Sequence, residues 1–283
     1  MTSRFHFIAR SLGFALAAFL LTWLPSLAIA QAQPKETPLD RYVNKPDPSF
    51  SWKVVSTKNV EGLTLVTMDV VSQNWLTPDK VNRTEWRHWV TVAFPSKVKS
   101  NIGFLMIGGG SNKDTTPPNP DDRILQIAKA TGTAVAELKM VPNQPLIFHN
   151  DGVSRTEDDL IGYTWDQFLK TGDPEWPARN PMVKSAVRAM DAITEMMASE
   201  DGGKQKVDKF VVAGGSKRGW TTWITGAVDK RVVGIIPIVI DVVNVNTSMQ
   251  HHFAAYGFWA PAVGNYVQHS IMQRMDHPKI KDL

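Results

Sequence analysis

The sequence predicts an α/β fold with a doubly wound, mostly parallel sheet. Continuous apolar runs occur at residues 101–110, 209–213 and 232–240, and such runs are typical of strands buried on both faces. Stretches with helical periodicity separate these runs, and glycine clusters follow two of them. Strands that alternate with helices along a chain favour parallel pairing through right-handed crossovers.

The first half of the chain supplies the early strands. Residues 31–50 contain four prolines and polar residues, so we expect an extended lead-in before a domain over 51–283. Residues 63–71 and 86–94 predict strands because β-branched and aromatic side chains recur near period two. A helix over 121–131 ends at Gly132, and residues 133–137 return to a strand.

The second half contains an insertion and the remaining α/β units. Residues 141–181 are rich in proline, and we expect an inserted region with one helix near 158–170. Asn180 and Pro181 open a helix whose apolar residues, several of them Met, recur every three or four positions. We interpret this Met stripe as core packing rather than as a cofactor site.

Composition limits the possible functions. The 283 residues are 43% hydrophobic and 20% charged, which indicates a globular protein. The absence of Cys excludes disulfide scaffolds, thiolate metal sites and cysteine nucleophiles. The formal net charge is only +4 and the basic residues do not cluster, so we expect no nucleic-acid partner.

Residues 1–30 predict a secretory signal peptide. Arg4 and Arg10 precede an apolar run at 11–24, and Ala28 and Ala30 provide a small-residue cleavage site. The run is shorter than the roughly 20 residues of a spanning helix, so an uncleaved anchor is the weaker alternative. We expect export to the periplasm or the medium, with no stable membrane span after cleavage.

Ser216 is the candidate nucleophile. It follows the apolar strand at 209–213 within the segment GGSKRG and precedes a helical pattern. In the nucleophile elbow of α/β-hydrolases, G-x-S-x-G, a strained strand-to-helix turn exposes the serine hydroxyl. Gly214 fits this pattern, but Arg218 occupies the second glycine position and Gly219 comes one residue later. The alternatives are a helix cap formed by Ser216 and a phosphate-binding turn, although the P-loop pattern is absent.

A second glycine-rich loop supports a hydrolase. Gly109 and Gly110 follow the strand at 101–107, where α/β-hydrolases place a loop that donates a backbone N–H to the oxyanion hole. The other donor would be the Lys217 amide. The side chains of Lys217 and Arg218 could add positive charge or select an anionic substrate; the alternative is that both are solvated.

The acid and base are harder to assign. Asp241 follows the strand at 232–240 and is a weak candidate for the acid, with helix capping as the alternative. None of the histidines occupies the position expected of a general base. A metal site at His251, His252 and Asp241 is a minor alternative, because adjacent histidines on a helix point about 100° apart. We expect neither a metal nor another cofactor.

Several long segments resemble the PhoPQ-activated pathogenicity-related protein family: LDRYVNKPDPSFSW at 39–52, WRHWV at 86–90, IGGGSN at 107–112, GGSKRGW at 214–220, PIVIDVVN at 237–244 and HHFAAYGFWAPAVGNY at 251–266. The resemblance implies export and a sheet of the α/β-hydrolase type. Residues 214–219 also resemble the G-x-S-R-x-G of glucuronoyl esterases, which implies that Lys217 helps to hold an oxyanion. Family members usually continue with two more strands, followed by an Asp and a His, so we expect this chain to be C-terminally incomplete.

The sequence therefore predicts an exported, esterase-like serine hydrolase with little activity in this form. Its substrate would be a small molecule, a sugar ester or a peptide. The alternative is a non-catalytic binding or virulence-associated protein on the same scaffold, in which tryptophans line a ligand groove. The tryptophans considered for that groove are Trp86, Trp89, Trp165, Trp176, Trp220, Trp223 and Trp259.

Overall fold

The computed structural model describes residues 36–241 and 244–280. The predicted signal peptide at 1–30 lies outside these residues. Among the described helices, none combines the length and the apolar character that crossing a membrane requires.

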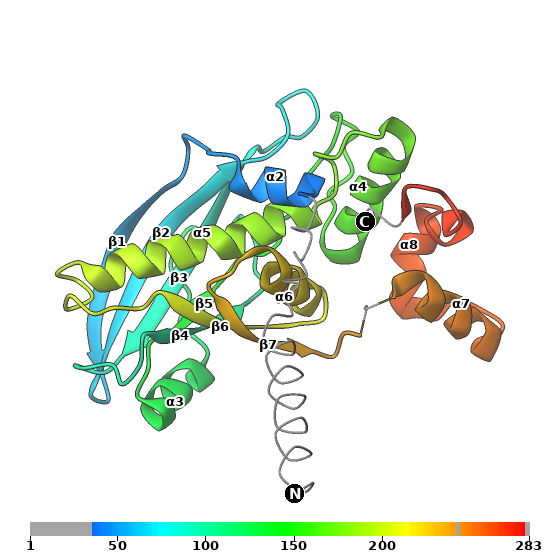
Figure 1. Ribbon diagram of the computed structural model, residues 1–283. Coiled ribbons are helices and arrows are strands. Elements are labelled where there is room, and N and C mark those ends of the chain that lie inside the picture. Colours follow the sequence, from blue (N-terminus) through cyan, green and yellow to red (C-terminus); the bar gives the residue numbers. More distant parts are fainter. Residues whose placement is uncertain (1–35, 242–243, 281–283) are drawn as a thin grey trace, which may run out of the picture. The chain divides into compact units, whose positions relative to one another are not determined.

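A seven-stranded sheet organises the described part of the chain (Figure 1). Its strands lie in the order β1-β2-β3-β5-β4-β6-β7. Their bounds are β1 (Ser51–Val60), β2 (Leu63–Asn74), β3 (Glu85–Phe94), β4 (Ile102–Ile107), β5 (Val135–Leu138), β6 (Lys209–Gly215) and β7 (Val232–Ile238). The pairs from β1 to β5 are antiparallel and those from β5 to β7 are parallel, so β1 and β3 alone oppose the common direction. The prediction of a mostly parallel sheet of the α/β-hydrolase type is confirmed.

Side chains of β2 alternate between two apolar clusters, one on each face of the sheet. Leu63 and Leu65 pack into the cluster that contains residues of helix α3 (Asp122–Thr131). Val66 and Met68 pack into the larger cluster, which contains residues of α5 (Arg179–Ala198). Because apolar residues point to both faces, helices cover both, and the doubly wound arrangement follows.

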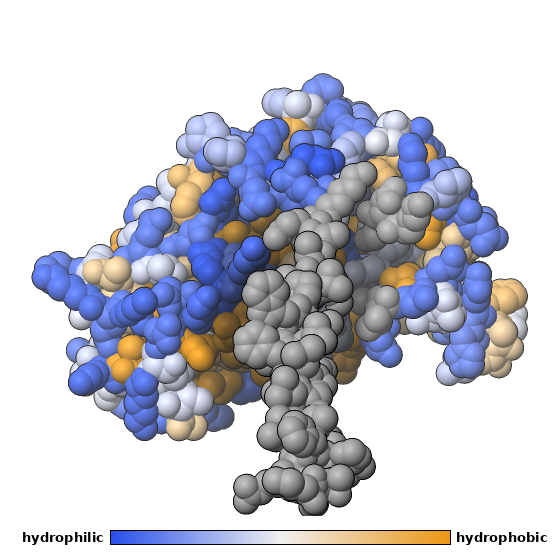
Figure 2. Space-filling model, in the orientation of Figure 1, coloured by the Kyte–Doolittle hydropathy of each residue, from blue (hydrophilic) through white to orange (hydrophobic). Residues whose placement is uncertain are grey.

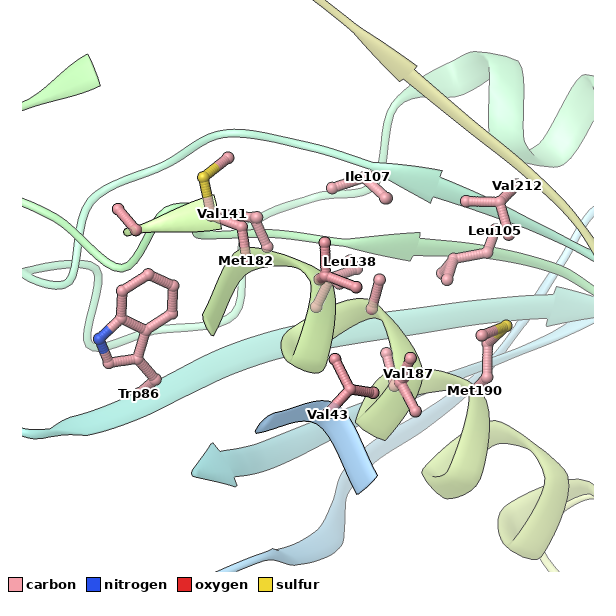
Figure 3. Packing of buried hydrophobic residues seen from close by; sticks show 14 of the residues in the cluster. Val43, Trp86, Leu105, Ile107, Leu138, Val141, Met182, Val187, Met190 and Val212 are labelled. Carbon is pink, nitrogen blue, oxygen red and sulfur yellow. The ribbon is translucent and has the colours of Figure 1, made fainter. Parts of the chain in front are cut away.

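Helix α5 forms the centre of the larger cluster. Figure 3 shows Met182, Val187 and Met190 of this helix beside strand residues such as Leu105 and Leu138. The predicted Met stripe is confirmed as core packing. Its buried members are Met182, Ala186, Ala189, Met190, Ile193 and Met197. Helix α6 (Lys217–Val228) packs beside α5 and against β6 and β7.

The lead-in differs from the expected extended segment. Helix α2 (Pro38–Asn44) forms within it, and Tyr42 and Val43 are buried. Thr37 and Asp40 close a capping box, and Pro38 occupies the first helical position, where its missing N–H costs nothing. The prolines suggested an extended chain, but one of them starts a helix.

The inserted region contains α4 (Glu157–Thr171), close to the predicted helix, and two cis peptide bonds, Val141-Pro142 and Gln144-Pro145. After β7 come α7 (Val245–Tyr256), α8 (Gly264–Gln268) and the 3-10 turns Pro261–Val263 and Met272–Arg274. Helix α8 packs on α4, whereas α7 has no buried residue. Figure 2 shows a face on which hydrophilic side chains predominate and hydrophobic ones form separate groups.

Candidate active site

Ser216 stands at a strained turn between β6 and α6. Its φ of 52° and ψ of −122° lie in a region that residues other than glycine rarely adopt. The residue is exposed, and its side chain makes no capping hydrogen bond to the helix. The alternative in which Ser216 serves as a helix cap is therefore wrong. Strain at an exposed serine is the geometry of a nucleophile elbow.

Two glycines make this turn possible. A Cβ on Gly214 would lie 2.5 Å from the backbone oxygen of Arg218, and one on Gly219 would lie 2.8 Å from the Gly214 oxygen. The helix therefore approaches the strand too closely for any side chain at either position. Gly219 performs the packing role of the second glycine of the motif, although it stands one residue later than the pattern requires.

The backbone around Ser216 is fixed by the neighbouring strand and the helix. The Ser216 amide donates to the Ile238 oxygen at 2.9 Å, and the Ser216 oxygen accepts from the Trp220 amide at 3.0 Å. The Lys217 amide begins α6 and donates to no acceptor within the residues that the structure describes. An unpaired amide at a helix start favours negative charge.

The glycine loop after β4 begins beside the elbow. Ile107 of β4 is in register with Gly214 of β6, and the two strands are parallel, so both loops leave the same edge of the sheet. The Gly109 oxygen accepts from the Met140 amide at 2.9 Å, which fixes the loop. Over the described ranges, the amides of Gly109 and Gly110 donate no hydrogen bond. The predicted donors are thus free to bind an acceptor.

The side chains of Lys217 and Arg218 are not solvated, contrary to one of the two predicted alternatives. Both lie against Glu157 at the start of α4. Lys217 Nζ is 2.8 Å from Glu157 Oε2, and its side chain is 10% exposed. Arg218 donates through Nη1 and Nη2 to both Glu157 oxygens, at 2.8 and 2.6 Å. The two positive charges next to Ser216 are therefore paired.

Glu157 is a functional candidate that the sequence did not reveal. Burial opposes its ionisation, but hydrogen bonds from Arg218 and Lys217 outweigh burial and lower its pKa to about 2. The carboxylate is therefore charged at neutral pH. Glu157 is the first of three consecutive acidic residues at the start of α4. Acidic residues at this position are usually explained by a favourable interaction with the helix dipole, so the sequence pattern did not indicate a contact with Lys217 and Arg218.

A buried arginine forms a hydrogen bond with the backbone of the elbow. Arg179 is 2% exposed, and its Nη1 donates to the Lys217 oxygen at 2.8 Å. Its guanidinium lies 4.1 Å from the centre of the Trp220 ring. Burial lowers the pKa of Arg179, while the Tyr266 and Asp158 side chains oppose this shift.

Among the described residues, no hydrogen bond joins Ser216 to Asp241 or to a histidine. Asp241 is exposed and follows β7 at the same sheet edge as Ser216. Five of the histidines bond elsewhere: His88 to Ser72 and Lys139, His149 to Tyr163, His252 to the Ala260 amide, His269 to Asp159 and His277 to the Lys279 amide.

The candidate tryptophans lie in the core, at the surface and in the lining of one cavity. Trp86, Trp89, Trp165 and Trp176 are buried, whereas Trp223 is 38% exposed. A cavity of about 1040 Å³ is lined by apolar side chains and by residues of the C-terminal segment. Its aromatic and aliphatic lining includes Trp165, Phe168, Trp220 and Ile224.

Comparison with known proteins identifies a family. The family model described as PhoPQ-activated pathogenicity-related protein matches residues 39–283. The sequence is 40% identical over 252 residues to autocrine proliferation repressor protein A of Dictyostelium discoideum. That match covers 87% of this chain and 50% of the relative, so the chain spans about half the relative's length.

Two solved structures with lower sequence identity to this chain are esterases. An acetyl xylan esterase from Paenibacillus sp. R4 has a TM-score of 0.47 and 13% identity, with 84% of this chain and 74% of that one covered. A glucuronoyl esterase from Teredinibacter turnerae has a TM-score of 0.35 and 15% identity, with 66% and 45% covered.

Proposed function

This chain belongs to the PhoPQ-activated pathogenicity-related protein family, and we propose that it is an esterase-type serine hydrolase with Ser216 as its nucleophile. The observation that supports the proposal most directly is the backbone of Ser216, strained at φ 52° and ψ −122° with an exposed side chain. Such strain persists only where the surrounding structure enforces it, and it concentrates at functional sites.

In the proposed reaction, Ser216 Oγ attacks the carbonyl carbon of an ester. The carbonyl oxygen becomes negative in the tetrahedral intermediate, and the amides of Lys217 and of Gly109 or Gly110 donate to it. Collapse of the intermediate breaks the bond to the alcohol and leaves an acyl-serine, which water then hydrolyses. The proton of Ser216 must pass to a base and then to the departing alcohol.

Among the described residues, no histidine forms a hydrogen bond with Ser216. Asp241 remains the proposed acid, and we propose that the histidine comes from outside the described residues. Removing members of a catalytic triad costs several orders of magnitude in rate, so we expect slow turnover from this chain.

A substrate class and a location complete the proposal. We propose a small-molecule ester, such as a sugar ester, with a peptide as the less favoured substrate. Residues 1–30 are the proposed export signal, and the family description names a relation to pathogenicity.

A fluorophosphonate probe tests the nucleophile. We expect intact-mass analysis to show slow addition of one probe to the wild type and none to Ser216→Ala. Ser270→Ala is the matched control, because Ser270 is also exposed and has a φ of 56° but lies after α8. Equal labelling of Ser216→Ala, or an unlabelled wild type, would contradict the proposal.

A non-catalytic regulatory protein is the second candidate function. Two observations favour it: five histidines bond elsewhere, and the name of the curated relative describes repression of proliferation rather than hydrolysis. A panel of ester substrates separates the two functions. Hydrolysis that disappears in Ser216→Ala excludes the non-catalytic candidate, and hydrolysis unchanged by this substitution excludes the catalytic one.

A further inference from the structure

Glu157 joins three separate parts of the chain around the elbow. It lies at the start of α4, in the inserted region, about 60 residues before Ser216 in sequence. On one side it binds Lys217 and Arg218 of α6. On the other side it exchanges two hydrogen bonds with Gln144: the Glu157 amide donates to Gln144 Oε1 at 2.7 Å, and Gln144 Nε2 donates to Glu157 Oε1.

The same contacts extend to the glycine loop. Gln144 Nε2 also lies 3.5 Å from the Gly110 oxygen. Arg218 Nε donates to the Val141 oxygen, and the Val141 amide donates in turn to the Gly108 oxygen at 3.1 Å. A Cβ on Gly109 would lie 2.7 Å from Arg218 Nη2, so the guanidinium packs directly on that loop. The carboxylate of Glu157 thereby connects the elbow to the glycine loop.

The backbone of Glu157 adds an independent observation. Its φ is 54°, which is unfavourable for a residue with a Cβ. The residue keeps this conformation while its side chain binds two cations whose own side chains are only 10% and 13% exposed. A carboxylate that bridges two largely buried cations resists displacement, because its loss would leave Arg218 without this carboxylate partner and Lys217 with Asp158 alone, at 3.3 Å.

We propose that Glu157 is a positioning residue that holds the Lys217 amide and the glycine-loop amides in a fixed relation. The effect of Glu157 on catalysis rests on the proposed hydrolase function, because the amides that it positions are the proposed oxyanion donors. Oxyanion donors act only when they are arranged before the reaction, and small displacements of such groups lower the rate strongly. Within the described residues, no hydrogen bond joins Glu157 to Ser216 or to a proposed donor amide, so it acts through Lys217, Arg218 and Gln144.

Hydrogen exchange tests the proposal without any need for turnover. The reporters are the bonded amides of Met140, Val141 and Trp220, which connect to the glycine loop and to Ser216. In Glu157→Gln we expect all three to exchange at least about 10-fold faster, since opening of the connected loops should limit their exchange. Asp229→Asn is the matched control, because Asp229 forms a similar two-oxygen pair with Arg231 at the opposite end of α6. We expect it to leave these amides unchanged.

Glu157→Asp provides a second variant if Glu157→Gln fails to fold. It keeps the charge but is too short to reach all partners, and we expect the same amides to exchange faster by a smaller factor. Unchanged exchange in the folded variants, or equal acceleration in Asp229→Asn, would overturn the proposal.

Probe labelling distinguishes this inference from the proposed function. We expect the labelling rate of Ser216 to fall about 10-fold in Glu157→Gln, as for a misplaced catalytic group. An unlabelled wild type would refute the hydrolase, while the exchange data would still decide whether Glu157 joins the loops. Normal labelling and normal exchange in Glu157→Gln would refute the positioning role alone.

Discussion

Gly214 and Gly215 are adjacent in β6, but only Gly214 is confined by its surroundings. A Cβ on Gly214 would lie 2.5 Å from the Arg218 oxygen and 2.9 Å from Thr222 Oγ1, whereas nothing lies within 4 Å of a Cβ on Gly215. Backbone atoms cannot move aside as a flexible side chain can. The close packing therefore requires a glycine at position 214 but leaves room for a side chain at position 215.

We predict that Gly214→Ala lowers the free energy of unfolding by about 2–3 kcal/mol, as for other overpacked sites, and abolishes probe labelling of Ser216. Gly215→Ala is the control and should change stability by less than about 1 kcal/mol. Urea denaturation of both variants measures the difference. Equal stabilities would show that α6 can move away from β6 without loss.

Residue patterns predicted some members of this site and missed others for a physical reason. Ser216, Gly109 and Gly110 lie in local motifs, where a few neighbouring residues specify the turn. Glu157 and Gln144 join the elbow only through contacts between segments far apart in sequence. Secondary-structure propensity and motif spacing do not predict such pairs, because the sheet and the inserted region must form before the residues come into contact.

At the scale of elements, the strength of the apolar sequence pattern determined which predictions succeeded, even for β7, which has no buried residue. Strands β4, β6 and β7 and helix α5 have strong apolar patterns, and the sequence predicted all four. Strand β1 lies at the sheet edge with mostly exposed or half-buried residues, so its pattern is weak. Helix α7 has no buried residue and thus gave no apolar stripe to recognise.

One buried polar group connects three of the predicted elements. His88 of β3 lies 3.0 Å from Ser72 Oγ of β2, which in turn lies 3.2 Å from Ser185 Oγ of α5. His88 is fully buried, and burial lowers its pKa to about 4 despite backbone hydrogen bonds that favour the charged form. The folded protein therefore keeps this imidazole neutral where an unfolded chain would protonate it.

We predict that stability falls with decreasing pH because of His88. An unfolded His titrates near pH 6.5, so between about pH 6.5 and 4 the unfolded state binds the extra proton and is favoured. The full contribution is present above about pH 6.5, and roughly 3 kcal/mol is lost by pH 4. Urea denaturation across this range should show the slope in the wild type and a reduced slope in His88→Gln. The exposed His251→Gln is the control. A slope that persists in His88→Gln would contradict the assignment.

At the scale of the whole molecule, the two edges of the sheet differ. Strand β1 is an edge with exposed Lys53 and Lys58, and its pairing register with β2 shifts at Val55. Charged residues and irregular pairing discourage another strand from adding to an edge. Strand β7 pairs only with β6 among the described residues and exposes Ile236 by 48% and Ile238 by 39%. Strand β7 therefore lacks the charged side chains of β1, although its pairing with β6 also shifts register, between Phe210 and Val211.

We predict that the chain associates with itself through β7. An edge strand offers unpaired N–H and C=O groups, and exposed aliphatic side chains on the same strand add apolar contact to the pairing. Ile236→Lys should increase the monomer fraction in sedimentation velocity at tens of micromolar protein, roughly the range where such exposed edges aggregate. The half-exposed side chain should make the change nearly neutral for folding.

Val55→Lys is the matched control for this prediction, because Val55 is 41% exposed on the opposite edge. It adds the same charge to the molecule while leaving β7 intact. If association is only a matter of net charge, both variants will reduce it equally, because Coulomb repulsion between whole molecules does not depend on which edge carries the lysine. If Ile236→Lys increases the monomer fraction and Val55→Lys does not, the contact between molecules lies at β7. A wild type that stays monomeric would refute the prediction.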